Sequence, residues 1–154
     1  GRRTYSFALV SSCVGRVIEG RCAGKVKSNF REEQEMARPR IISSGSIDLR
    51  RYESANLDNG AIGGFGVDIW YQSTTPVRNY LTPRNGARLA LGDRARKGYS
   101  GCSAETYSTA PIPLWTIPIG SYVCAKTDQG RFSEFRLSGF AGTTMELDYT
   151  TWEK

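Results

Sequence analysis

The residues best suited to chemistry lie in the stretch VDIWYQ, residues 67–72, which alternates apolar and polar side chains. Successive side chains of a strand point to opposite faces, so a strand here places Asp68, Trp70 and Gln72 in one row. A sugar presents apolar C–H faces and a fan of hydroxyls, and this row offers a stacking ring beside a carboxylate and an amide. The row therefore predicts a carbohydrate-binding surface, unless a second layer of protein covers that face.

A second run near the end of the chain repeats this alternation. In MELDYTTW, residues 145–152, one face of a strand would carry Glu146, Asp148, Thr150 and Trp152. If this strand and residues 67–72 share one sheet with these faces aligned, two tryptophans and three carboxylates come together. We therefore predict Asp148 and Trp152 as further ligand-binding residues. Arg78, on the loop after residues 67–72, is predicted to contact an anion or a hydroxyl.

The chain of 154 residues contains no histidine. Mechanisms of the Ser-His-Asp or Cys-His type are therefore excluded, as are metal sites that depend on imidazole. Glu146, Asp148, a distant arginine and Ser73-Thr74-Thr75 follow the order of the Arg, Ser-Thr-Ser, Glu-x-Glu arrangement of ADP-ribosyltransferases, which they resemble. The chain departs from that pattern at Asp148 and Thr75, where the arrangement has glutamate and serine. We expect no enzyme, no catalytic residue and no cofactor.

Four cysteines stand at Cys13, Cys22, Cys102 and Cys124. Structural zinc sites usually bring their ligands in pairs two to four residues apart, which this spacing lacks, so we expect disulfides and no metal. The most economical of the three possible pairings joins Cys13 to Cys22 and Cys102 to Cys124. Disulfides form in oxidising compartments, so a secreted or cell-surface location is expected.

The loop CVGRVIEGRC, residues 13–22, supports a separate hypothesis. Closed by a disulfide, it would display Arg16 and Arg21 in the way that some protease inhibitors present a basic specificity residue. A cleavable loop or an ordinary stapled turn explains the same residues.

The net charge of +6, from 21 basic and 15 acidic residues, suits an anionic partner such as nucleic acid, an acidic glycan or a surface polymer. Basic residues cluster at Arg2-Arg3, across residues 38–51 and at residues 94–97. No recognised nucleic-acid motif accompanies these clusters, and an evenly solvated surface explains the charge more simply. A glycan or anionic surface polymer is the partner we predict.

The elements that must position these residues are mostly strands. Asn59-Gly60 and TPRNG, residues 82–86, are turn signals, and YVCAKT, DQG and RFSEFRL form a strand, a turn and a strand. Residues 28–37 are the only stretch with helical composition. No apolar run approaches the roughly 20 residues that cross a bilayer.

These signals predict an all-β fold, an antiparallel sandwich or barrel with at most one short helix, stabilised by disulfides. We expect a single β-rich domain over residues 1–154. Residues 1–44 would form a stapled hairpin with a short helix or loop, and residues 45–154 the main β region. Because the chain begins at Gly1 rather than methionine, we expect a processed or excised fragment.

The motifs GVDIWYQ, PRNGARLALGD, GSYVCAKTDQGRFSEFRL and LDYTTW, together with Arg78, extend over Gly45 to Trp152. This region resembles an uncharacterised β-rich domain of predicted exported bacterial proteins, with an Asp-Ile-Trp strand, a Pro-x-Asn-Gly-Ala turn and a C-terminal hairpin. The resemblance implies the β fold and export. It implies no activity, cofactor or residue role.

Taken together, these features predict an exported, non-catalytic binding domain for carbohydrate or another cell-surface polymer. The alternative is a structural subunit of an extracellular assembly or filament. In that case the chain would form homo-oligomers by exchanging β-strands, with Gly1 to Val10 as the donor strand.

Overall fold

The computed structural model describes Val17–Ile18, Gly20–Arg21 and residues 39–154. The chain divides into two units, Gly1–Arg38 and Pro39–Lys154. In the first unit, the short strands β2 (Val17–Ile18) and β3 (Gly20–Arg21) pair antiparallel. The predicted Cys13–Cys22 bridge, the helix predicted at residues 28–37 and the donor strand Gly1 to Val10 lie outside the described residues.

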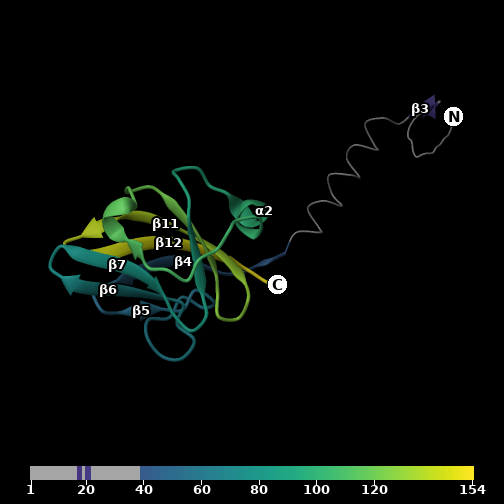
Figure 1. Cartoon of the computed structure of the whole chain (residues 1–154). Coiled ribbons are helices and arrows are strands. Elements are labelled where there is room, and N and C mark those ends of the chain that lie inside the picture. The colour runs from purple at the N-terminus through teal and green to yellow at the C-terminus, as the bar shows by residue number, and fades with distance from the viewer. Residues whose placement is uncertain (1–16, 19, 22–38) are drawn as a thin grey trace. The chain divides into compact units, whose positions relative to one another are not determined.

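The second unit consists of two antiparallel sheets (Figure 1). The five-stranded sheet has the order β4-β12-β11-β10-β8, with β4 at Ile41–Leu49, β12 at Thr144–Trp152, β11 at Phe132–Ala141, β10 at Tyr122–Lys126 and β8 at Arg88–Leu91. The four-stranded sheet has the order β5-β6-β7-β9, with β5 at Ser54–Ala55, β6 at Ile69–Thr75, β7 at Arg78–Pro83 and β9 at Ile112–Pro113.

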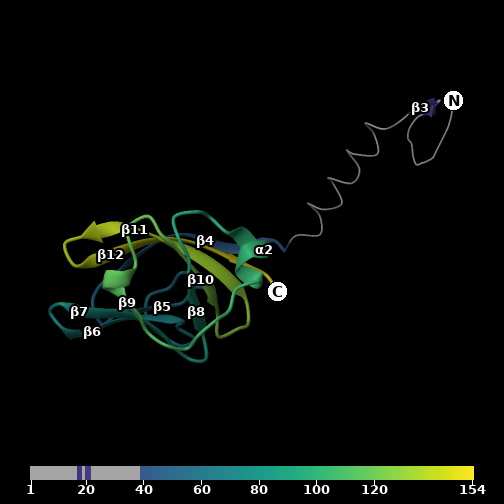
Figure 2. The same ribbon diagram turned by 45° about the horizontal axis from the view of Figure 1, so that its top comes forward.

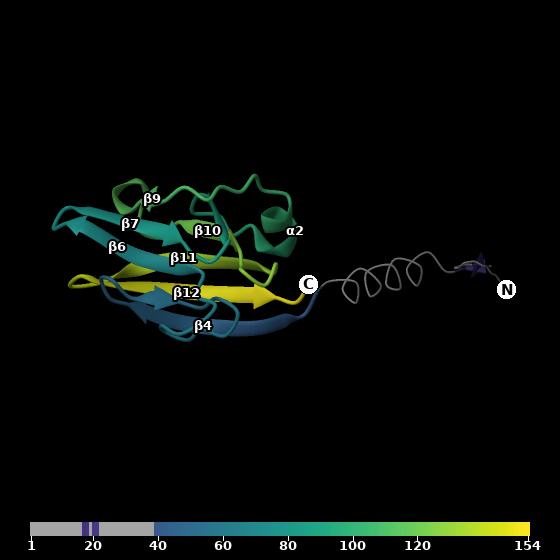
Figure 3. The same cartoon turned by 60° about the horizontal axis from the view of Figure 1, so that its bottom comes forward.

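The two sheets pack face to face, with β6 and β7 in one layer and β4, β11 and β12 in the other (Figure 3). Alternation along each strand produces the core between them. On β12, Met145, Leu147 and Tyr149 point inward and are buried. Ile69 and Tyr71 of β6 meet them from the other sheet in the same hydrophobic core. The predicted all-β antiparallel fold is confirmed, and of the two forms that the sequence left open, sandwich and barrel, the structure shows the sandwich.

The turns follow the chemistry of their residues. Asn85 and Gly86, between β7 and β8, both adopt positive φ angles of 57° and 86°, as the TPRNG stretch predicts. The hairpin predicted around DQG is also present, because β10 and β11 pair antiparallel from Tyr122 opposite Arg136 to Lys126 opposite Phe132.

One short α-helix, α2 (Gly98–Ser103), and one 3-10 turn, η1 (Leu114–Thr116), complete the second unit. The predicted disulfide Cys102–Cys124 is confirmed and ties α2 to β10. Figure 2 shows β9 alongside β7, and α2 beside the C-terminal end of the chain. Within the described ranges, no helix is long and apolar enough to cross a membrane.

The sandwich begins before residue 45, where the main β region was predicted to start. β4 opens at Ile41, and its first residues pair with the end of β12, with Ser44 opposite Thr150. The side chains in this part of β4 are exposed or half-buried. This stretch therefore lacks the apolar alternation that marks a strand in the sequence.

Candidate functional site

Trp70 and Gln72 lie on the outer face of the four-stranded sheet. Their neighbours Ile69 and Tyr71 fill the core, so alternation turns Trp70 and Gln72 away from it. Trp70 stands opposite Thr82 of β7, and Gln72 stands opposite Tyr80. The sequence prediction of one shared face is therefore met for Trp70 and Gln72.

Two further aromatic side chains extend this face. Tyr80 lies beside β9, opposite Pro113, and its ring meets Trp115 of η1 edge to face with 5.4 Å between the centroids. The Trp115 side chain is 59% exposed. The surface formed by these residues is called the aromatic face, and its members are Trp70, Gln72, Tyr80, Thr82, Arg84 and Trp115.

The polar contacts of the aromatic face hold its rings in place. The indole N–H of Trp70 donates to the backbone carbonyl of Tyr52 at 3.2 Å, and the Arg84 guanidinium lies 4.9 Å from the centroid of the Trp70 ring. Thr82 donates its hydroxyl to the amide oxygen of Gln72 at 2.7 Å. These contacts fix the orientation of the half-buried indole ring, and the Arg84 guanidinium covers one of its faces.

Asp68 does not belong to this face, which corrects the predicted row. Its side chain is fully buried, and it precedes β6, which begins at Ile69. One carboxylate oxygen accepts the backbone N–H of Leu57 and the other accepts that of Asp128, both at 2.7 Å. Asp68 therefore fastens the loop after β5 to the turn between β10 and β11, and no surface ligand reaches it.

Asp68 is part of a cluster of three carboxylates. Asp58, Asp68 and Asp128 each place an oxygen within 4.8 Å of the others, and such oxygens are the ligands that Ca²⁺ prefers. The hydrogen bonds of Asp58 and Asp68, however, join the loop after β5 to the turn between β10 and β11. Asp58 accepts hydrogen bonds from the Thr127 hydroxyl at 2.9 Å and from Arg131 at 3.1 Å.

Burial alters the protonation of this carboxylate cluster. It raises the pKa of Asp68 to about 7, and the charge of Asp58 nearby adds to this effect. Burial also raises the pKa of Asp58, although Arg131 opposes the rise. One buried oxygen of Asp58 and one of Asp128 have no hydrogen-bond partner within the described residues. Burial therefore favours the protonated form of Asp68, and the negative charge of Asp58 beside it acts in the same direction.

Arg78 and the predicted residues of β12 lie elsewhere. Arg78 is exposed at the start of β7, where its backbone N–H bonds the Thr75 hydroxyl at 3.0 Å. Asp148 and Trp152 lie on the outer face of the five-stranded sheet, opposite to the buried side chains of β12. β12 belongs to this sheet, whereas β6 belongs to the four-stranded sheet. The condition for the two tryptophan rows to come together, that both strands share one sheet, is therefore not met, and the two outer faces of a sandwich point in opposite directions.

Trp152 has a packing contact of its own. Its ring meets Tyr99 of α2 edge to face, with 5.8 Å between the centroids, and Tyr99 also contacts Phe132. The Trp152 side chain is half-buried in this cluster. Its contacts are therefore those of a residue that holds α2 against the sheet.

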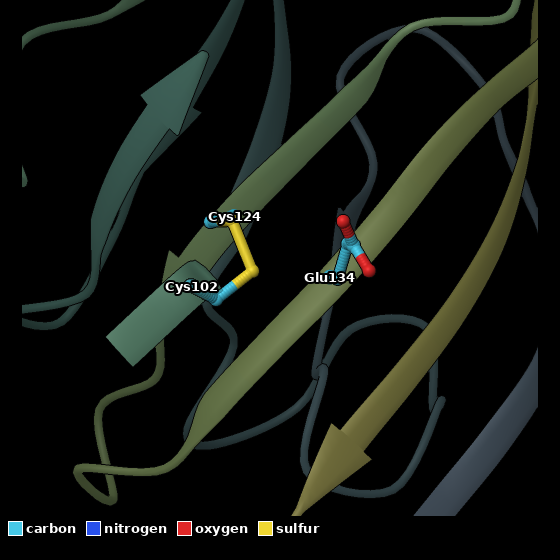
Figure 4. Close-up of side chains that lie close together, drawn as sticks. All are labelled: Cys102, Cys124 and Glu134. Carbon is cyan, nitrogen blue, oxygen red and sulfur yellow. A yellow bond between two sulfur atoms is a disulfide. The ribbon is translucent and has the colours of Figure 1, made fainter. Parts of the chain in front are cut away.

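Asp148 lines a polar pocket on the outer face of the five-stranded sheet, close to the disulfide. Figure 4 shows Cys102 bonded to Cys124, with Glu134 on the adjacent strand β11. Each of these three side chains places one potential ligand atom within 4.8 Å of the others, close enough to share a metal ion. The two sulfurs are bonded to each other, so they offer no thiolate for a metal.

The sequence reasoning missed Tyr80, Arg84 and Trp115. A partial signal was present, because Tyr80 and Thr82 flank the apolar Leu81 in RNYLTP. Trp115 follows PIPL, residues 111–114, in a turn without alternation, so only the contact with Tyr80 identifies it.

Comparisons of the chain with protein-family models, curated proteins and solved structures found no match in any of the three. The resemblance to an exported bacterial β-rich domain therefore remains a hypothesis, and the candidate site is assigned from its own geometry.

Proposed function

We propose that this protein is an exported, non-catalytic binding domain whose aromatic face binds carbohydrate. The observation that carries this proposal is the alignment of Trp70, Tyr80 and Trp115 across one outer sheet face, with the polar Gln72 and Thr82 between them. Aromatic rings offer apolar stacking surfaces for the C–H faces of sugars, and the amide and hydroxyl groups offer hydrogen bonds to sugar hydroxyls.

The openness of this face favours a polymer over a single sugar. Its rings belong to a sheet surface and a turn, and the most exposed ring, that of Trp115, stands 59% open to solvent. A chain of sugars lying across the sheet would contact several rings at once. A surface glycan is therefore the ligand class that we assign.

The proposed location outside the cell rests on the disulfide. Cys102–Cys124 joins two segments of the sandwich, and such bonds persist in oxidising compartments. The resemblance to exported bacterial domains supports the same location.

A glycan array of bacterial and host surface polysaccharides tests the carbohydrate proposal. Trp115→Ala should lower the apparent affinity for the bound glycan about tenfold, equal to roughly 1.4 kcal/mol. Trp70→Ala should act in the same direction. Trp115 lies in a short exposed turn, so its removal should leave the fold intact.

Phe65→Ala is the matched control, because Phe65 is a fully exposed aromatic residue on the loop before β6. It should bind glycan as the unchanged protein does. An array without signal, or a signal that Trp115→Ala and Trp70→Ala leave unchanged, would remove the proposal.

A second candidate function is that of a structural subunit in an assembly. The nine-residue strand β4 pairs only with β12 among the described residues, and it carries the exposed side chains of Ile41 and Ile42. A long edge strand with exposed apolar residues is a template for a strand of another chain.

A further inference from the structure

The outer face of the five-stranded sheet contains a pocket of about 270 Å³, open to solvent and distinct from the aromatic face. It is called the arginine pocket, and its lining residues are Arg96, Tyr122, Glu134, Arg136, Asp148, Tyr149 and Thr150. Its volume lies below the range of roughly 300–1,000 Å³ that is common for drug-sized ligands, so it suits a ligand of about one sugar ring.

The pairing of β10, β11 and β12 places the polar side chains of the pocket in two rows. Tyr122 of β10, Arg136 of β11 and Asp148 of β12 stand opposite one another in a row. Glu134 and Thr150 form the next row on the same face. Opposed residues on one sheet face have Cβ atoms about 5 Å apart, so these side chains form a continuous polar floor.

A second arginine stands behind Arg136. Both side chains lie beside Gly120, because a Cβ atom placed there would be 3.6 Å from Nε of Arg94 and 3.7 Å from Nη2 of Arg136. Nε of Arg94 also donates to the backbone carbonyl of Ile119 at 3.2 Å, which holds the Arg94 side chain in place. Arg96 lines the pocket from the same loop.

These arginines lack an ionic partner in the part of the chain that the structure describes. None of them is within 4.0 Å of a carboxylate there, since the ion pairs involve other residues. Glu134 forms no ion pair with them within the described residues, and its two oxygens accept the backbone N–H groups of Lys97 and Gly98 at 2.7 and 3.1 Å. Glu134 instead anchors the loop that carries Arg94 and Arg96.

Asp148 supplies the opposite chemistry in the same pocket. One of its oxygens accepts the Ser46 hydroxyl at 2.9 Å, and the side chain is exposed. A carboxylate can accept hydrogen bonds from ligand hydroxyls, and it repels a compact dianion such as sulfate or phosphate. A ligand that complements both the arginines and Asp148 therefore carries one negative charge and several hydroxyls.

We propose that the arginine pocket binds one acidic sugar residue of the uronic acid type. The guanidinium groups of Arg136 and Arg96 bind the sugar carboxylate, since their planar donors match carboxylate geometry. Asp148 accepts hydrogen bonds from the sugar hydroxyls. The pocket and the aromatic face lie on different sheets, so this proposal can be tested independently of the function proposed for the aromatic face.

Nuclear magnetic resonance titration of the full chain with methyl glucuronide tests the proposal, with methyl glucoside and sodium sulfate as matched probes. The glucuronide should produce saturable shifts of backbone amides in β10, β11 and β12. Its affinity should exceed that of methyl glucoside at least tenfold, because the glucoside lacks the carboxylate.

Substitutions separate the role of each side chain. Arg136→Gln should weaken glucuronide binding at least tenfold, and Arg136→Lys should weaken it less, since it keeps the charge but not the planar fork. Asp148→Asn should raise the affinity for sulfate relative to that for glucuronide. Arg78→Gln, which removes an exposed arginine from the other sheet, should leave both affinities unchanged.

Trp115→Ala should leave glucuronide binding in the arginine pocket unchanged, which distinguishes this inference from the proposal for the aromatic face. Circular dichroism and the melting temperature check that each variant folds. The inference is overturned if sulfate binds as tightly as the glucuronide, if no saturable shift appears, or if folded Arg136→Gln binds as the unchanged protein does.

Discussion

At the scale of single residues, Asp68 and Trp70 have different roles although one residue separates them. Asp68 accepts two backbone N–H groups in the interior, whereas Trp70 presents its ring on the outer face. A buried carboxylate that joins two loops must be matched by donors or neutralised by a proton. Asp68 has both: two backbone N–H groups donate to its oxygens, and its pKa is raised to about 7, which favours the protonated form at lower pH.

The unfolding free energy should fall as the pH rises from about 4 to about 7. The pKa of Asp68 is raised from 3.8 to about 7 in the folded chain, so over this range the folded state keeps a proton that the unfolded state has released. Stability is then lost with rising pH, and the loss levels off above about pH 7. Urea denaturation at several pH values measures this slope.

Asp58→Asn should make the slope shallower, because it removes a negative charge that raises the pKa of Asp68. Asp48→Asn, on the exposed outer side of β4, is the matched control and should keep the original slope. A stability that rises steadily between pH 4 and 7 in the unchanged protein would contradict the raised pKa of Asp68.

At the scale of elements, α2 depends on contacts outside itself. A helix of six residues is too short to be stable alone. It is held by the bond from Cys102 to Cys124, and its Tyr99 packs against Trp152 and Phe132. The backbone at its start is bonded to Glu134. The loop that carries Arg94 and Arg96 leads directly into this anchored helix, so these contacts also position the arginine pocket.

The double variant Cys102→Ala, Cys124→Ala should lower the unfolding free energy by about 3 kcal/mol, the value expected for a disulfide that closes a loop of this length. The two cysteines are 22 residues apart in sequence. Urea denaturation under non-reducing conditions measures the difference.

A reductant should destabilise the unchanged protein and should have a smaller effect on the double variant. Equal stability of the double variant and the unchanged protein would show that α2 is held by its packing contacts alone. The arginine pocket should also lose glucuronide affinity in the double variant if α2 positions its loop.

At the scale of the whole molecule, the sandwich of residues 39–154 presents two chemically different outer faces. The four-stranded sheet displays aromatic rings, and the five-stranded sheet displays arginines and a carboxylate. The net charge of +6 belongs to the whole chain; residues 39–154 contain 13 basic and 11 acidic residues, so the sandwich itself carries a net charge of +2. A glycan that contains uronic acid residues is the ligand that the two proposals together predict.

Assembly through the edge strand β4 belongs to this scale as well. If chains join at this edge, size-exclusion chromatography with light scattering should show larger species as the protein concentration rises. Ile42→Lys should abolish them, because a charge on an edge strand opposes pairing with another chain. Val77→Lys, in the exposed turn between β6 and β7, is the control. A chain that stays monomeric at all concentrations excludes the structural role.

Local sequence signals were sufficient for the longer strands and the main turns of the sandwich, but not for the start of β4 or for α2, which lies outside the one stretch of helical composition at residues 28–37. Turn residues such as Asn85-Gly86 specify their own backbone angles, and alternation in MELDYTTW specifies which residues of β12 point inward. The pairing of Cys102 with Cys124 followed from an economical choice among three arrangements, and the structure confirms it.

The composition of the candidate sites depended on contacts between distant segments. Trp70 meets Thr82 across a strand pair, Tyr80 meets Trp115 across a turn, and Arg94 approaches Arg136 over Gly120. Alternation assigns a face within one strand, but it does not state which strands become neighbours. Sequence reasoning therefore found Trp70, Gln72 and Asp148 without their partners.

The sequence by itself determined the fold class, the absence of histidine chemistry and the faces of the individual strands, because these properties depend on residue types and short-range geometry. Only the tertiary structure decided that β6 and β12 enter different sheets and that Asp68 lies beneath a loop. Sheet order and burial arise from the packing of segments far apart in the chain. The single row expected at residues 67–72 thus became a buried carboxylate at Asp68, which joins two loops, and the half-buried pair Trp70 and Gln72 on the outer face.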